Sequence, residues 1–179
     1  MGEDDVTLDM MSWNADVTRL PERMHYEYLS ELFLKDALAE GHFHFDGKGI
    51  ALMDIHVPLF AVGTLRDHVS PWKSVYKIHL LTDTETTFVL ASGGHNAGIV
   101  SEPGHAHRSY QISAMPKGHD WLEPDEWITK AARHDGSWWE AFQAWLAERS
   151  GEMRPTASLN TKANLGDAPG LYVHQRYAD

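Results

Sequence analysis

"VPLFAVGTLRDHVSPWKSVYKIHLLTDTETTFVLASGGH", residues 57–95, contains two apolar runs separated by a helical pattern. The run at 57–64 is almost continuously apolar, as in a strand buried on both faces of a parallel sheet. Ser70 and Pro71 suit an N-cap and a first helical residue, and apolar residues follow at helical spacing: Trp72, Val75, Tyr76 and Leu80. A second strand is expected at 87–91. Strand, helix and strand within about 35 residues predict a parallel crossover unit, which is right-handed in most proteins.

Asp67 and His95 each follow the end of one predicted strand. The carboxyl ends of neighbouring parallel strands meet at one edge of a sheet, roughly 5 Å apart, and ligands bind beyond that edge. The two side chains are therefore expected to lie within hydrogen-bonding reach. In this order they match the acid and histidine of the nucleophile, acid, histidine series of α/β-hydrolases. Two other interpretations stay open: Asp67 braces the helix that begins near Pro71, and His95 is an ordinary loop histidine.

The nucleophile of such a series is missing from the sequence before Asp67. A nucleophile elbow needs a frame such as Gly-x-Ser-x-Gly or its cysteine equivalent. No such frame is present, Ser12 and Ser30 lack the strand–turn–helix context, and the 179 residues contain no cysteine. The lack of cysteine also excludes disulfides and thiolate metal sites within this sequence. The sequence therefore predicts the second and third members of a triad without the first.

The chain is expected to divide into four segments that differ in composition and periodicity: 1–12, a polar, frayed end; 13–56; 57–151, an α/β core; and 152–179, mostly loop. In the second segment, apolar residues at helical spacing predict an amphipathic helix from Pro21 to about Glu40. Asp46 and Gly47 predict the turn of a small hairpin.

The sequence after the crossover is predicted to be helical with loops. One helix is expected to begin near Pro124, and another at 138–146 with a capping box from Ser137 to Glu140. Gly151 is expected to end the second helix. Its predicted apolar face consists of Trp138, Ala141, Phe142, Trp145 and Leu146.

The composition narrows the class of protein. A hydrophobic content of 42% with 23% charged residues is typical of a globular protein. No apolar stretch approaches the roughly 20 residues of a membrane span, and "MGEDDVTLDM" lacks the features of a signal peptide, so a cytoplasmic protein is expected. A net charge of −11 argues against nucleic acid as a partner. No metal site is expected, because the His42/His44 and His105/His107 pairs lack a third ligand at motif spacing.

Five stretches give a more specific signal because they occur in a fixed order: "WNADVTRLP" (13–21), "LRDHVSPWKS" (65–74), "SGGHNAGIV" (92–100), "PDEW" with "GSWWEAFQAWL" (124–146) and "APGLYV" (168–173). Together they resemble the C-terminal part of the polyhydroxyalkanoate synthases, nearest to class I. The resemblance implies the C-terminal portion of an α/β-hydrolase fold, an α/β class of parallel strands with crossover helices. It also implies that residues 13–56 form part of a helical cap.

The resemblance further implies an acyltransferase that polymerises (R)-3-hydroxyacyl-CoA through a Cys, Asp, His triad, without a cofactor. By motif match the acid falls on Asp67 and the histidine on His95. The cysteine would lie upstream of Met1, so the chain is expected to be a fragment that is inactive alone. His95 would deprotonate the cysteine, and Asp67 would either orient His95 or activate the 3-hydroxyl group. His68 is a candidate substrate contact, with a structural role as its alternative.

The expected partners are the acyl-CoA substrate, the polymer product, and either a second copy of the chain or a companion chain that carries the missing half. The polymer granule surface is the alternative to a purely cytoplasmic location. Two other functions stay open. One is a non-catalytic remnant or partner-binding module, and the other is an esterase fragment of the α/β-hydrolase type.

Overall fold

The computed structural model describes residues 19–156, 167, 169–171 and 174. The chain divides into two units, Lys35–Glu152 and Met1–Leu34 with Met153–Asp179. The predicted frayed end at 1–12 and most of the predicted tail at 152–179 lie outside the described residues. The segment boundaries expected from the sequence stay predictions.

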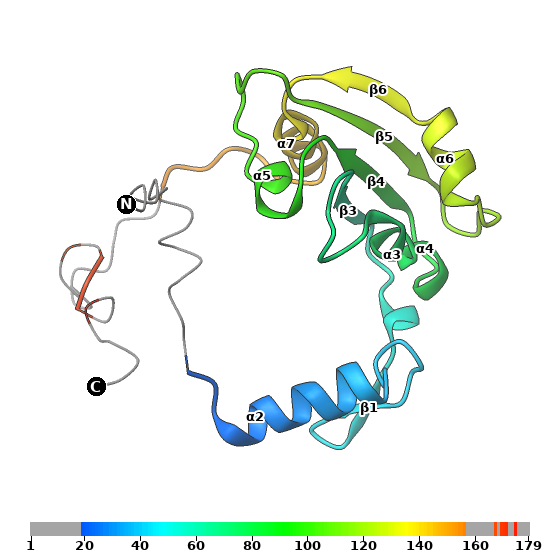
Figure 1. Cartoon of the computed structure of the whole chain (residues 1–179), viewed down its shortest axis with the longest axis vertical. Coiled ribbons are helices and arrows are strands. Elements are labelled where there is room, and N and C mark those ends of the chain that lie inside the picture. The colour runs from blue at the N-terminus through cyan, green and yellow to red at the C-terminus, as the bar shows by residue number, and fades with distance from the viewer. Residues whose placement is uncertain (1–18, 157–166, 168, 172–173, 175–179) are drawn as a thin grey trace, which may run out of the picture. The chain divides into compact units, whose positions relative to one another are not determined.

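The two strands of the expected crossover pair in parallel (Figure 1). Strand β3 (Leu59–Thr64) runs beside β4 (Thr86–Ala91), with Leu59 opposite Thr86 and Thr64 opposite Ala91. The connection passes through two short helices, α3 (Trp72–Tyr76) and α4 (Ile78–Leu81). The predicted strand–helix–strand unit is thereby confirmed.

Two further strands extend the sheet on the other side of β4, in the order β3-β4-β5-β6. β5 (Ser109–Met115) and β6 (Ala132–Asp135) are both antiparallel to their neighbours. The prediction of only helix and loop after the crossover was wrong here. The α/β class holds, but the sheet is mixed, because only the β3–β4 pair is parallel.

Both faces of the sheet are covered at β4. All six residues of this strand are buried, and successive side chains point to opposite faces. Phe88 and Leu90 join α3 and helix α6 (Pro124–Lys130) in one cluster, which includes Trp72, Tyr76 and Trp127. Val89 and Ala91 pack on the other face against Trp138 of helix α7 (Trp138–Glu148). The two helices predicted near Pro124 and at 138–146 are confirmed.

β3 is an edge strand, and this changes its burial from that expected. Only Gly63 and Thr64 are buried, whereas the first four residues, from Leu59 to Val62, are half-buried. The prediction of a strand buried on both faces was therefore wrong for most of β3, since no described strand lies along its outer side.

The helix after β3 begins differently from the prediction. Pro71 is the residue before the first helical turn, and no side chain caps α3. Ser70 is therefore not the cap; its backbone N–H instead donates to Asp67. Leu80 is exposed and His79 is buried in its place. The helical pattern breaks at Lys77, between α3 and α4, and the break shifts the buried face by one residue.

Helix α7 has the predicted N-cap but not the predicted capping box. The Ser137 side chain accepts a hydrogen bond from the backbone N–H of Trp139, and no bond from Glu140 back to Ser137 is present. The helix ends at Glu148, before Gly151. Of its expected apolar face, Leu146 is 43% exposed.

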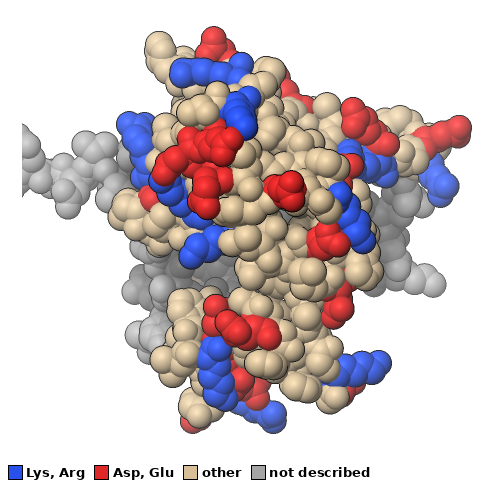
Figure 2. All heavy atoms as spheres, turned by 90° about the vertical axis from the view of Figure 1, so that its right-hand side faces the viewer, with Lys and Arg blue, Asp and Glu red and all other residues tan. Residues whose placement is uncertain are grey.

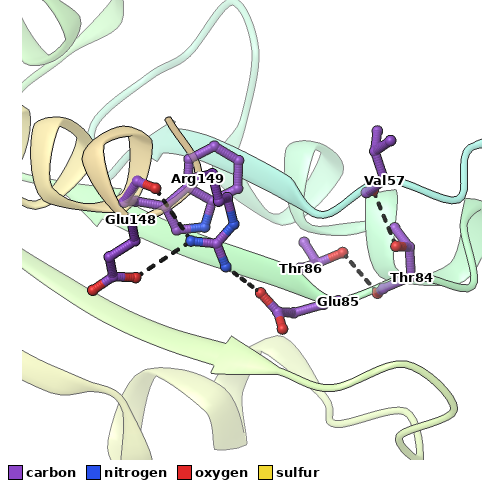
Figure 3. A network of polar contacts seen from close by, with 7 residues as sticks. Val57, Thr84, Glu85, Thr86, Glu148 and Arg149 are labelled. Atoms are coloured by element: carbon purple, nitrogen blue, oxygen red, sulfur yellow. Dashed lines mark hydrogen bonds and ion pairs between the residues drawn. The ribbon is translucent and has the colours of Figure 1, made fainter. Parts of the chain in front are cut away.

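At the end of the sheet where β3 and β4 begin, a network of polar contacts ties α7 to the strands (Figure 3). Arg149 donates to Glu85 over 2.6 Å, and its guanidinium lies 4.2 Å from the centre of the Trp145 ring. Thr84 donates to the carbonyl of Val57, which precedes β3. These contacts fix the C-terminal end of α7 to the start of the strands.

The segment before the sheet contains a helix and a hairpin, as expected. In one unit, α2 (Glu22–Glu27) continues into a π-helix, η1 (Tyr28–Leu34), which ends before the predicted limit at Glu40. In the other unit, β1 (Phe43–Phe45) and β2 (Lys48–Ile50) form the predicted hairpin, and a 3₁₀ turn, η2 (Leu52–Asp54), follows.

Acidic and basic side chains of the described residues are intermixed on the face shown in Figure 2. Several form ion pairs, including Lys73 with Asp125 and Lys130 with Glu126. Among the described residues, no helix combines the length and the apolar character needed to cross a lipid bilayer.

Candidate active site

The chain after β3 turns so that the Asp67 carboxylate is held by the backbone beyond it. One oxygen, Oδ1, accepts hydrogen bonds from the backbone N–H groups of Val69 and Ser70, both over 2.8 Å. The other oxygen, Oδ2, accepts from the Thr64 hydroxyl over 3.3 Å. The Asp67 side chain is only 7% exposed. The carboxylate is thus fixed in place before any contact with His95 is counted.

These contacts keep Asp67 ionised. The pKa of the Asp67 carboxyl is lowered to about 2, first by the N–H of Ser70 and further by His95 and Val69, although burial opposes the shift. Hydrogen bonds to a charged carboxylate stabilise the charged form. At neutral pH Asp67 therefore accepts hydrogen bonds and cannot donate one.

His95 is the first residue of a short helix, α5 (His95–Ile99), and not a loop residue as expected. Its Nδ1 lies 2.9 Å from Oδ2 of Asp67, so the expected contact between the two side chains is present. Because the carboxylate only accepts, Nδ1 carries the proton and Nε2 has a free lone pair. Within the described part of the chain, no hydrogen bond engages Nε2. The His95 side chain is 44% exposed, so the imidazole is accessible from solvent.

The loops that carry Asp67 and His95 are joined to each other beyond the strand ends. The backbone N–H of Leu65 donates to Ala91, and that of Arg66 donates to Gly93, both over 2.9 Å. Gly93 has a φ of +113°, and a Cβ there would lie 2.9 Å from the Cα of Gly98. Glycine is required at this position because both the conformation and the close approach exclude a side chain.

Thr64 is a member of the site that sequence reasoning missed. It is 2% exposed and ends β3, where its hydroxyl donates to Asp67. Its methyl group also contacts α5, since a Cβ on Gly98 would lie 2.5 Å from Thr64 Cγ2. No sequence signal distinguishes such a threonine from any other residue at a strand end.

The other candidate residues from the sequence make no hydrogen bond or ion pair to Asp67 or His95 within the described residues. His68 is exposed, and no hydrogen bond or ion pair joins its ring to a described residue, so its contact with a substrate stays a prediction. His105 bonds Glu102 and His44 bonds the carbonyl of His42. Within the described residues no group of three or more potential ligands is arranged to hold a metal ion.

A small cavity of about 90 Å³ lies beside the two loops. It is lined by Leu65, Leu90, Ser92, Ser109, Tyr110, Gln111 and Arg133, and includes neither Asp67 nor His95. Pockets for drug-sized ligands occupy roughly 300–1,000 Å³. This cavity alone is therefore too small to enclose a coenzyme A thioester.

The pair has a definite chemical capability. An ionised carboxylate on Nδ1 fixes the tautomer of the imidazole and stabilises the imidazolium, while Nε2 accepts a proton from a nucleophile. The 179 residues contain no cysteine to serve as that nucleophile. The described contact between His95 and Asp67 is the one that the acid and the base of a triad would need.

Comparison with known proteins gives sequence relatives of the chain. No family model matches the chain. The chain is 32% identical over 176 residues to the poly(3-hydroxyalkanoate) polymerase subunit PhaC of Rhizobium meliloti, which covers 98% of the chain and 28% of that protein. It is 35% identical over 179 residues to poly(3-hydroxyalkanoate) polymerase 2 of Ectopseudomonas oleovorans, covering 98% of the chain and 31% of that protein.

A third relative, the poly(3-hydroxyalkanoate) polymerase subunit PhaC of Cupriavidus necator, is 33% identical over 177 residues, with 96% of the chain and 29% of the relative covered. The chain thus spans less than a third of the length of these relatives. The sequence similarity leads to one conclusion. The chain is a relative of the poly(3-hydroxyalkanoate) polymerases and is homologous to a C-terminal portion of them.

Proposed function

We propose that the chain supplies the acid and the base of a polyhydroxyalkanoate polymerase, an acyltransferase that joins (R)-3-hydroxyacyl units from acyl-CoA and releases CoA. The observation that carries the proposal is the 2.9 Å contact between His95 and Asp67 at the ends of two parallel strands. Sequence outside these 179 residues provides the cysteine nucleophile.

In the proposed reaction, Nε2 of His95 takes the proton from the cysteine thiol. The thiolate attacks the thioester carbonyl, and the bond to the CoA sulfur breaks. CoA leaves with the proton that His95 holds. The 3-hydroxyl group of the next unit then attacks the acyl-enzyme, gives its proton to His95, and displaces the enzyme sulfur.

Asp67 acts in this scheme by orienting His95. Three of its contacts are with Val69, Ser70 and Thr64, the fourth is with His95, and the side chain is 7% exposed. A carboxylate with a pKa of about 2 is a weak base. These features favour orientation over direct deprotonation of the substrate hydroxyl, the other role considered for Asp67.

The outer side of β3 is the proposed junction with the cysteine-bearing part. β3 is an edge strand of six residues, and the exposed Val57 and Leu65 lie just before and after it. An edge of this kind presents unpaired N–H and C=O groups to another strand. We place the companion strand here, whether it comes from a longer chain, a second copy or a separate protein.

Apolar side chains near the pair suit an acyl chain or a polymer. Leu65 and Val69 flank Asp67. Ile99 is the last residue of α5 and Val100 follows it. All four are at least 40% exposed. We propose that the chain acts in the cytoplasm, at the surface of the polymer granule, because these exposed apolar side chains suit contact with the polymer.

A second candidate function is a non-catalytic module that binds a partner, and the lack of any cysteine favours it. The deciding experiment replaces the matching C-terminal portion of the Rhizobium meliloti polymerase with this chain. The chimera is expected to release CoA from (R)-3-hydroxybutyryl-CoA, and His95→Ala and Asp67→Asn each to lower the rate at least about 10²-fold. A folded chimera with wild-type oligomeric state and no CoA release would favour the non-catalytic module.

A further inference from the structure

Helix α5 is too short to determine its own position. It has five residues, and its helical hydrogen bonds include Gly98 N–H to Gly94 and Val100 N–H to Asn96. Isolated helices below about 12–15 residues are marginal in water. The direction in which α5 presents His95 therefore depends on contacts with other elements.

The start of α7 supplies donors to the end of α5. The indole N–H of Trp138 donates to the Gly98 carbonyl over 3.1 Å, and that of Trp139 donates to the Ile99 carbonyl over 2.8 Å. The hydroxyl of Ser137 donates to the Ser101 carbonyl. Carbonyls at a helix end lack donors within the helix. Trp138 and Trp139 satisfy the last two carbonyls of α5, and the N-cap Ser137 binds the chain just beyond it.

Helix α5 also rests on β3, the strand that leads to Asp67. Gly98 lies against Thr64, so closely that a Cβ would come within 2.5 Å of the Thr64 methyl group. The Thr64 hydroxyl donates to Asp67. Gly98 of α5 is thereby in contact with both Thr64 and Trp138, and Thr64 contacts both α5 and the carboxylate.

The Trp138 ring is itself fixed by the core. It is 8% exposed, and its ring centre lies 6.4 Å from that of Phe60 and 5.9 Å from that of Phe142. Trp139 packs edge-on against Trp138 and is 37% exposed. The direction of both indole N–H groups is therefore set by packing on the sheet and not by α5.

We propose that Trp138 and Trp139 are positioning residues for His95, which fix the direction of α5 and so the contact of His95 with Asp67. Both act through the α5 backbone, since their donors bind carbonyls three and four residues after His95. The inference rests on the proposed function in treating His95 as the base, but it is tested on the chain itself without any activity assay.

The test uses nitrogen-15 NMR of the chain with Trp138→Phe, Trp139→Phe and both together. Phenylalanine keeps an aromatic ring and removes the N–H donor. In the wild type the imidazole nitrogen shifts of His95 are expected to show a single tautomer with the proton on Nδ1. In the variants a mixture of tautomers is expected, with amide hydrogen exchange at Gly98 and Val100 about tenfold faster for each lost bond.

The matched control is Trp127→Phe. The Trp127 indole donates to the Ser113 hydroxyl over 2.7 Å, in the cluster on the opposite face of the sheet, and the residue is 1% exposed. This variant should lower global stability and leave the His95 tautomer unchanged. Because Trp139 is partly exposed, Trp139→Phe decides the matter if Trp138→Phe does not fold.

Wild-type tautomer and exchange in folded Trp139→Phe would overturn the proposal, as would an equal effect of Trp127→Phe. The outcome is independent of that for the proposed function. An altered tautomer beside an inactive chimera would refute only the catalytic role, and an unaltered tautomer beside an active chimera would refute only the positioning role.

Discussion

Oδ2 of Asp67 lies 2.9 Å from Nδ1 of His95, while the other oxygen of the same carboxylate receives two backbone N–H groups. The carboxylate therefore joins the turn after β3 to the first residue of α5. Protonation of this carboxylate would weaken both the turn after β3 and the contact with His95.

The stability of the chain should fall between pH 3.8 and pH 2 because of Asp67. Its pKa is about 2 in the folded chain, against 3.8 for an unperturbed aspartate side chain. The unfolded chain takes up the proton first as the pH falls, so the contribution of Asp67 is complete above 3.8 and is lost as the pH passes through 2. Urea unfolding at several pH values measures this. Asp67→Asn should flatten the slope in that window, and an unchanged slope would contradict the prediction.

His79 should make the chain less stable between pH 6.5 and pH 4. Burial, together with the nearby His119, lowers its pKa to about 4. Neither ring nitrogen of His79 has a hydrogen-bond partner within the described residues. As the pH is lowered, His79 is protonated first in the unfolded chain. The free energy of unfolding therefore decreases as the pH is lowered through this window, by roughly 1–3 kcal/mol.

Replacing His79 with Phe should remove that loss, as measured by thermal unfolding at pH 5 and pH 7. The control is His68→Phe, at an exposed position, which should keep the pH dependence of the wild type. Equal behaviour of the two variants would show that another group causes the loss.

Gly98→Ala should separate His95 from Asp67. The new methyl group would lie 2.5 Å from Thr64 Cγ2, so α5 or Thr64 must move. The Nδ1 proton of His95 should then exchange faster with water in proton NMR. Gly94→Ala is the matched control, since its Cβ would meet nothing closer than the Arg66 carbonyl at 3.7 Å. A wild-type imidazole signal in folded Gly98→Ala would contradict the assigned contact.

The chain alone should release no CoA from (R)-3-hydroxybutyryl-CoA above a blank. It contains no cysteine, and members of a triad act as a unit, so an acid and a base without their nucleophile keep little of the rate. A thiol reagent suits the assay because every thiol detected comes from CoA. Release that disappears in His95→Ala would reveal an activated water or hydroxyl and favour an esterase.

The isolated chain should self-associate through the outer edge of β3. Light scattering is expected to show dimers or larger species at micromolar concentration. Val57→Lys, at a position 66% exposed beside the start of β3, should reduce association because charged residues protect sheet edges. Leu80→Lys, at a position 55% exposed on α4, is the control and should have less effect. A wild-type chain that stays a cooperatively unfolding monomer would argue against the proposed junction.

The crossover and the Asp67–His95 contact could be predicted because both follow from local patterns and one rule of sheet geometry. Apolar runs identified β3 and β4, and parallel strands bring their carboxyl ends together. β5 alternates Tyr110 and Ile112 with polar residues, which is the pattern of a strand with one buried face. β6 has the sequence ARHD, which carries no such signal and is a strand only because it pairs with β5.

The contacts that hold α5 in place could not be predicted from the sequence. The contacts from Trp138 to Gly98 and from Gly98 to Thr64 join residues far apart in the sequence. Neither follows from periodicity or propensity. The exposure of Leu80 could not be predicted from periodicity either. The spacing of apolar residues predicts the buried face correctly up to Tyr76, but the interruption at Lys77 turns the following residues by one position.

Helix α7 is attached at both of its ends, by Trp138 and Trp139 to α5 and by Arg149 to Glu85 at the start of β4 (Figure 3). An α-helix turns by about 100° for each residue. Inserting or deleting a single residue within Trp138–Glu148 would therefore rotate one attachment away from its partner while the other stayed in place. The number of residues in α7 is therefore fixed by its two attachments. Insertions and deletions among natural variants of the protein should occur in the turns around this helix.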